Sequence, residues 1–137
     1  MQDRMSIILF SGTLDKLMAA SILTGGAAAM GMEVELFLTM WGLLAFRKDA
    51  DPTQMHISAD FAAQESQMLQ VMQTKKVPSW QENIESAKEV GLVKVYACGM
   101  SMDLFDLHHE DLTLVDDVVG VATFAERAKE GKITLFI

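Results

Sequence analysis

Cysteine and proline are almost absent from this chain of 137 residues, which has one cysteine, Cys98, and two prolines. One cysteine cannot form a disulfide within the chain, which excludes the disulfide-stabilised class of small secreted domains and favours a reducing, cytoplasmic location. Basic residues are also few, because 11 Lys and Arg stand against 19 Asp and Glu, for a net charge of −8. Nucleic acids and anionic membranes attract clustered positive charge, so we expect neither as a partner.

Long hydrophobic runs are missing as well. The longest weakly polar stretch, residues 17–32, is shorter than the roughly 20 residues that a membrane span needs. The first residues, Met1-Gln-Asp-Arg4, lack the basic start of a signal peptide. What is abundant is apolar surface: half of the residues are hydrophobic, and 11 of them are methionines. An excess of this kind predicts surface that is buried between subunits, and hence a homo-oligomer.

The order of the apolar segments predicts an α/β fold. A buried strand, an amphipathic helix at residues 14–30 and a second strand form a strand–helix–strand unit, which implies parallel strands and right-handed crossovers. A helix at residues 79–91 begins with a capping box made by Ser79 and Glu82, and another is expected at residues 122–130. The strands are expected at residues 5–11, 32–39, 92–98, 112–115 and 132–137.

These segments give one domain over residues 1–137, with an open parallel sheet of about five strands and helices on both faces. We expect the flavodoxin-like strand order 2-1-3-4-5. Residues 48–79 interrupt the alternation of strands and helices and contain an amphipathic stretch at residues 61–74. We interpret them as an inserted helical segment, either a lid, an interface element or a mobile region.

Cys98 is the strongest candidate for chemistry because of its place in the pattern. It ends the third strand, Gly99 permits a turn, and Ser101 or Asp103 can cap the helix that follows. A thiol beside the first N–H groups of a helix has a lowered pKa and more reactive thiolate. The alternative is structural, since a free cysteine is among the residues most often buried in a core.

A second turn should lie close to Cys98 if the predicted strand order holds. The first and third strands would then be neighbours, so that Ser11-Gly12-Thr13 and Cys98-Gly99-Met100 line one crevice. Its N–H groups would favour a thiolate, a persulfide or a bound anion. Trp41 follows the second strand and would line a pocket or a subunit contact.

Other catalytic signals are weak. His108 and His109 are adjacent and point in different directions, and His56 is distant in sequence, so we predict no metal site. The chain has no phosphate-binding loop, dinucleotide fingerprint or nucleophile elbow, and we expect no cofactor.

Five blocks of sequence resemble the DsrE/DsrF/DsrH-like family, in the branch labelled peroxiredoxin-like. Together they cover nearly the whole chain: Phe10-Ser-Gly-Thr-Leu-Asp-Lys16, Gly26-Ala-Ala-Ala-Met-Gly-Met-Glu-Val34, Phe37-Leu-Thr-Met-Trp-Gly-Leu43, Ala97-Cys-Gly-Met-Ser-Met-Asp-Leu104, and Gly120-Val-Ala-Thr-Phe124 through Phe136-Ile137. The stretch after Arg47-Lys48 departs from the family, which is richer there in Gly, Lys and Met.

The resemblance implies a role in sulfur relay. It implies a flavodoxin-like sheet, homo-oligomers, a strand-end cysteine that carries sulfur as a persulfide, and exchange with small TusA-like carriers and rhodanese-like proteins. The cysteine is Cys98, and the other motif positions correspond to Gly12, Asp15, Lys16, Met100, Ser101, Met102 and Asp103.

Three hypotheses follow. The first is a sulfur carrier or sulfurtransferase in which Cys98 holds the sulfur and the backbone around Gly12, Thr13, Gly99, Met100 and Ser101 stabilises the anion. The second is a non-catalytic module that binds a small anion, a nucleotide or a protein. The third is peroxide reduction through a sulfenic acid on Cys98, which would need an outside thiol for recycling.

Overall fold

Five parallel strands form one open sheet in the computed structural model, which describes residues 2–137. The strands are β1 (Gln2–Leu9), β2 (Glu33–Leu38), β3 (Val93–Cys98), β4 (Asp117–Val119) and β5 (Gly131–Phe136). Every pair of neighbours runs parallel. The predicted fold class, an open α/β sheet of about five strands with helices on both faces, is confirmed.

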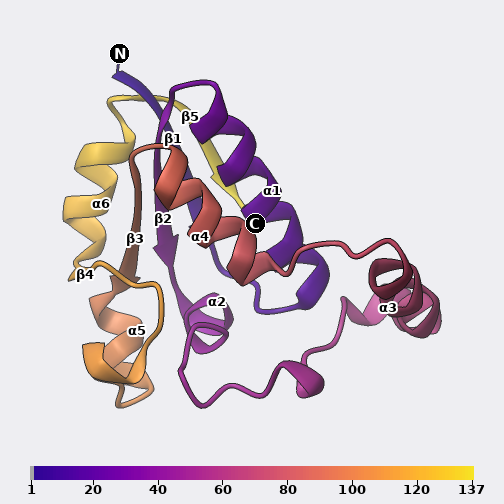
Figure 1. The fold of residues 1–137 in the computed structure, drawn as a ribbon. Coiled ribbons are helices and arrows are strands. Elements are labelled where there is room, and N and C mark those ends of the chain that lie inside the picture. Colours follow the sequence, from indigo (N-terminus) through magenta and orange to yellow (C-terminus); the bar gives the residue numbers. More distant parts are fainter. Residues whose placement is uncertain (1) are drawn as a thin grey trace.

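The predicted strand order, however, is wrong. The strands lie in the order β4-β3-β2-β1-β5, so β2 separates β1 from β3. The reason lies in helices α1 (Leu14–Ala29) and α4 (Trp80–Val90), which pack against each other on the same face of the sheet (Figure 1). Right-handed crossovers whose helices share a face must advance in one direction, from β1 to β2 to β3. The order 2-1-3 would have placed these two helices on opposite faces.

The larger core lies between the sheet and these two helices. The residues of β2 that point to this side, Val34, Leu36 and Leu38, are completely buried. Trp80 at the start of α4 packs against Phe46, with the ring centroids 4.8 Å apart. The predicted capping box of α4 is present, since Ser79 and Glu82 exchange hydrogen bonds.

Helix α6 (Val121–Ala128) covers part of the opposite face. Its Phe124 stacks on Phe37 of β2, with ring centroids 4.4 Å apart. Farther along β2, Glu35 is completely buried and forms ion pairs with Arg4 of β1 and Arg127 of α6. Because an unpaired buried carboxylate is costly, this network fixes the position of α6 on the sheet.

The sequence predicts a strand at residues 112–115, but this apolar run does not form one. β4 begins five residues later than Leu112, at Asp117, where the backbone pairs with Tyr96. Leu112 is buried because it packs on the edge of the larger core and forms an isolated bridge with Arg47. Burial, not strand pairing, explains the apolar character of this run.

Residues 48–79 form an excursion between β2 and α4. After the short helix α2 (Met40–Leu44), the chain passes through two 3₁₀ turns, η1 (Pro52–Gln54) and η2 (Ala59–Gln64), into α3 (Glu65–Thr74). Helix α3 contains no buried residue and projects from the body of the molecule (Figure 1). Two further short elements, α5 (Gly99–Leu104) and η3 (His109–Asp111), connect β3 to β4. Among residues 2–137, the helices are too short or too polar to traverse a lipid bilayer.

Candidate functional site

Cys98 lies at the carboxyl end of β3 and is also the N-cap of α5. The helix begins at Gly99 without the intervening turn that the sequence suggested, so neither Ser101 nor Asp103 caps it. Cys98 is 1% exposed and packs in a cluster with Phe37 and Phe124. Its sulfur is therefore covered, and it sits against the first turn of a helix.

Four hydrogen-bond donors converge on the sulfur of Cys98. Burial alone would raise the pKa of the thiol. Hydrogen bonds from the backbone N–H and the hydroxyl of Ser101, the hydroxyl of Thr39 and the N–H of Met100 outweigh this effect and lower the pKa below its ordinary value. The structure thus stabilises the thiolate, relative to the thiol, in a place where burial alone would destabilise it.

Ser101 connects the cysteine to the end of β2. Its hydroxyl is 3.0 Å from the hydroxyl of Thr39 and accepts the N–H of Met40 at 3.1 Å. Met40 has a φ angle of 51°, in the left-handed region that residues other than glycine rarely adopt. Ser101 therefore stabilises a strained turn and the thiolate at once, a combination typical of functional sites.

The remaining predicted residues of this strand end differ in exposure. Met102 is buried, Gly99 is half-buried, and Asp103 faces solvent. Met100 and Leu104 are 68% and 60% exposed. These two apolar side chains on α5 lie beside the buried cysteine and are available to a partner molecule.

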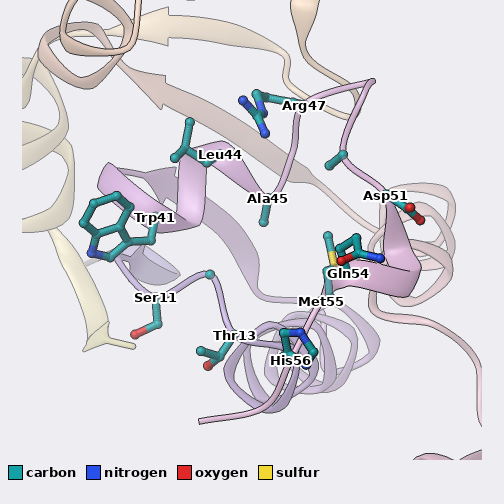
Figure 2. Close-up of a pocket in the computed structure, with 12 residues that line it drawn as sticks. Ser11, Thr13, Trp41, Leu44, Ala45, Arg47, Asp51, Gln54, Met55 and His56 are labelled. Carbon is teal, nitrogen blue, oxygen red and sulfur yellow. The ribbon is translucent and has the colours of Figure 1, made fainter. Parts of the chain in front are cut away.

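The Ser11-Gly12-Thr13 turn, predicted to lie beside Cys98, is part of a separate cavity. Ser11, Gly12 and Thr13 line a cavity of about 420 Å³ together with Trp41, as Figure 2 shows. β2 separates this turn from the Cys98 turn, so the predicted shared crevice does not form. Gly12 lies against α2, where a Cβ atom would come within 2.5 Å of the Trp41 carbonyl oxygen.

Asp15 and Lys16, at the start of α1, are also remote from the groups that contact the cysteine. The carboxylate of Asp15 accepts the N–H of Ser58 at 3.0 Å. Burial opposes ionisation of Asp15, but hydrogen bonds from Ser58 and Thr13 lower its pKa. Lys16 is exposed. Asp15 thus attaches the 48–79 excursion to the start of α1.

Trp41 lies between the cavity at the Ser11-Gly12-Thr13 turn and the helix α5 that follows Cys98. It is 51% exposed, lines the cavity, and has its ring centroid 6.0 Å from that of Phe105, just after α5. Trp41 was expected to line a pocket or a subunit contact; it lines the cavity, and its exposed ring stays available for a subunit contact. Thr39 and Arg47 were missed by the sequence reasoning. Thr39 could have been found, because it ends the strand beside Cys98 once β2 and β3 are known to pair.

The histidines make other contacts. His56 pairs with Glu65 at 3.1 Å, and Nε2 of His109 lies 2.9 Å from the carbonyl oxygen of Val115. Within the described residues, 2–137, no three His, Cys, Asp or Glu side chains gather closely enough to hold a metal ion.

A comparison with known families adds an independent observation. The sequence profile of the DsrE/DsrF/DrsH-like family matches residues 1–65 and 55–136. The chain belongs to this family. Two solved structures share its fold: a protein of unknown function, MTH1491, from Methanobacterium thermoautotrophicum, with a TM-score of 0.66 at 14% identity and 98% coverage of both chains, and the YchN protein from E. coli, with a TM-score of 0.58 at 17% identity and 100% coverage of both.

Two known proteins are similar to this chain over almost their whole length. The uncharacterized protein YrkE of Bacillus subtilis is 37% identical over 155 residues, covering 98% of this chain and 96% of YrkE. The sulfur carrier protein DsrE2 of Allochromatium vinosum is 31% identical over 158 residues, covering 99% of each chain. Both alignments are longer than the 137 residues of this chain, so both relatives contain residues that this chain lacks.

Proposed function

We propose that this chain carries sulfane sulfur as a persulfide on Cys98 and passes it to a thiol of a partner protein. The observation that carries the proposal is the place of the chain's single cysteine, at the end of β3 and at the N-cap of α5, where hydrogen bonds from Ser101, Thr39 and Met100 lower the pKa of its thiol. Membership of the DsrE/DsrF/DrsH-like family and similarity to a sulfur carrier protein of Allochromatium vinosum support it.

The transfer has two balanced steps and involves no net oxidation. The Cys98 thiolate attacks the outer sulfur of a donor persulfide, the donor's S–S bond breaks, and the donor leaves as a thiolate while Cys98 becomes a persulfide. A thiolate of the acceptor then attacks that outer sulfur, the S–S bond on Cys98 breaks, and the Cys98 thiolate is restored. The N–H groups of Met100 and Ser101 stabilise the negative sulfur before and after the transfer.

Access to the sulfur requires movement of side chains that pack against it. Cys98 is 1% exposed and clusters with Phe37 and Phe124, whereas Met100 and Leu104 on α5 are largely exposed. Opening of this cluster would admit a small donor or acceptor thiol and leave the N–H groups of α5 in place. A partner protein that binds Met100 and Leu104 would lie beside this opening.

The other elements of this proposal come from the sequence and from the family. We propose a cytoplasmic protein, formed by one domain with an inserted segment at residues 48–79, that exchanges sulfur with TusA-like and rhodanese-like proteins. Gly99 begins the helix that faces the sulfur. Gly12, Thr13 and the supporting residues Ser11, Asp15, Lys16 and Trp41 would act one strand away, by shaping the same edge of the sheet.

We further propose that the chain forms homo-oligomers through the outer face of α1. This face is entirely apolar between Lys16 and the end of the helix; its exposed residues are Ala19, Ile22, Leu23, Gly26 and Ala29, followed by Met30. Gly25 and Gly26 cost about 1 kcal/mol each relative to alanine inside a helix. No atom lies within 4 Å of a Cβ placed on either glycine, so packing within one chain does not require them. Close approach of a second copy of the chain would require these two glycines.

The persulfide is tested by intact-protein mass spectrometry after incubation with an organic persulfide donor. We expect the wild-type chain to gain the mass of one sulfur atom, which a reducing thiol removes and an acceptor thiol receives. Cys98→Ser should gain nothing. An unmodified wild-type protein with several donors, or equal modification of Cys98→Ser, would contradict the proposal.

The alternative is a non-catalytic module that binds a small anion, a nucleotide or a protein. The burial of Cys98 and the separate cavity beside Trp41 favour it. Labelling of the native protein with a thiol reagent distinguishes the two functions. A carrier should react near neutral pH, faster than the same cysteine would if its pKa were unshifted, whereas an inert Cys98 that reacts only after denaturation supports the binding module.

A further inference from the structure

The cavity beside Trp41 lies outside the cysteine site, and Cys98 is not among its lining residues. Its walls come from the turn after β1, from α2 and from the segment that follows α2 (Figure 2). We infer that this cavity binds a small organic acid, with an apolar body and a single carboxylate or sulfonate group.

Arg47 supplies the partner for the acid group. Its Nε is buried and forms no hydrogen bond with the described residues, and its one ion pair is a 3.5 Å contact with Asp49, a largely exposed side chain. A buried donor without a partner is destabilising. The Arg47 side chain as a whole is 40% exposed and lines the cavity. Because the edge of a guanidinium group matches the two oxygens of a carboxylate, a bound acid would pair with its accessible N–H groups. Figure 2 shows the guanidinium group above Ala45, another residue that lines the cavity.

The apolar walls define the body of the ligand. Trp41, Leu44, Ala45 and Met55 present an aromatic ring, two aliphatic side chains and a thioether to the cavity. The volume of about 420 Å³ lies within the range of roughly 300–1,000 Å³ found for sites of small organic molecules. The indole ring of Trp41, 51% exposed, offers a flat surface on which a planar group can stack.

Asp51 limits the charge of the ligand. Its carboxylate accepts hydrogen bonds from the N–H and the hydroxyl of Thr53, which lower its pKa and keep it ionised. His56, the other titratable wall residue, is paired with Glu65. The cavity therefore presents one cation, Arg47, whose ion pair with Asp49 is long, together with the anion of Asp51, which suits a monoanion and opposes a polyanion such as a nucleoside triphosphate.

The test uses naphthylacetic acid and its uncharged amide, with binding to the full-length protein measured by calorimetry and by the NMR signal of the Trp41 indole N–H. We expect the acid to bind more tightly than the amide. Arg47→Gln should weaken binding of the acid by about tenfold or more and leave the amide unchanged. Ala45→Leu, which fills the cavity, should weaken both ligands. Lys48→Gln, a neighbouring loss of charge outside this cavity, should affect neither.

Several results would overturn the inference. They are equal binding of acid and amide, an Arg47→Gln variant that binds the acid as well as wild type, or inorganic sulfate that competes as strongly as the organic acid. Arg47 is partly exposed, so its substitution is expected to leave the fold intact. The outcome is separate from the persulfide test, because neither readout involves Cys98.

Discussion

Replacement of Ser101 by alanine tests the reasoning about the cysteine site most directly. Ser101 is completely buried, and its hydroxyl contacts Thr39, the N–H of Met40 and the sulfur of Cys98. Alanine removes this hydroxyl and leaves the Met40 N–H, in its strained left-handed turn, without its acceptor. Loss of a partner from a buried polar group costs roughly 1–3 kcal/mol. For a chain of this length, Tm falls by about 4 °C for each kcal/mol.

The same substitution should change the chemistry of Cys98 in a defined direction. One hydroxyl and its contribution to the anion are lost while burial remains, so the pKa of the thiol should rise. The rate of alkylation by iodoacetamide at neutral pH should fall, and its pH profile should move to higher pH. The assay compares these profiles with thermal unfolding of the same samples.

Ser6 provides a matched control. It is also a completely buried serine on the sheet, but its hydroxyl has no hydrogen-bond partner in the described structure. Ser6→Ala should therefore leave stability unchanged or raise it slightly, with the Cys98 profile unaffected. The reasoning is refuted if both alanine variants lose the same stability, or if Ser101→Ala leaves the thiol profile in place.

Four further predictions concern the core, the proposed oligomer and the ionisation of Cys98. Glu35→Ala should cost roughly 3 kcal/mol in chemical denaturation, because it removes the buried carboxylate that pairs with Arg4 and Arg127 and leaves buried Arg4 with the partly exposed Glu33. Gly42→Ala should also destabilise the fold, since the new Cβ would lie 2.1 Å from a carbonyl oxygen of β1. Gly26→Ala, in contrast, should stabilise the monomer by about 1 kcal/mol and weaken self-association in sedimentation experiments. The pKa of Cys98 is lower in the folded protein than in the unfolded chain, so its ionisation stabilises the fold. This stabilisation is complete above the pKa of the unfolded thiol and disappears as pH falls through the folded pKa. The difference in free energy of unfolding between wild type and Cys98→Ser should therefore shrink as pH falls through this range.

Most of the secondary structure and the fold class could be predicted from the sequence, because local signals are strong there. The capping box at Ser79 and the alternation of apolar residues in β2 and β3 are readable without a structure. The strand order could not be predicted, since it depends on which face each helix covers. Nor does local sequence show what Gly25 and Gly26 of α1 pack against, and in the structure both face open space.

The candidate site was predicted in part for the same reason. The position of Cys98 at a strand end beside a helix start follows from local sequence. Its hydrogen bond with Thr39 depends on β2 lying next to β3, which only the three-dimensional arrangement reveals. Arg47 was not singled out, because a single arginine after a short helix carries no recognisable pattern.

The pairing of β1 with β5 has a practical consequence for how this protein is handled. Since these neighbouring strands are parallel, β1 begins at the amino-terminal end of the strands and β5 finishes at their carboxyl-terminal end (Figure 1). The last carbonyl group, that of Ile137, accepts the N–H groups of Phe10 and Ser11 at 2.7 and 3.2 Å. A purification tag fused after Ile137 would emerge next to the cavity wall and could obstruct ligand or partner access there, so tags belong at the amino terminus, on the far side of the molecule.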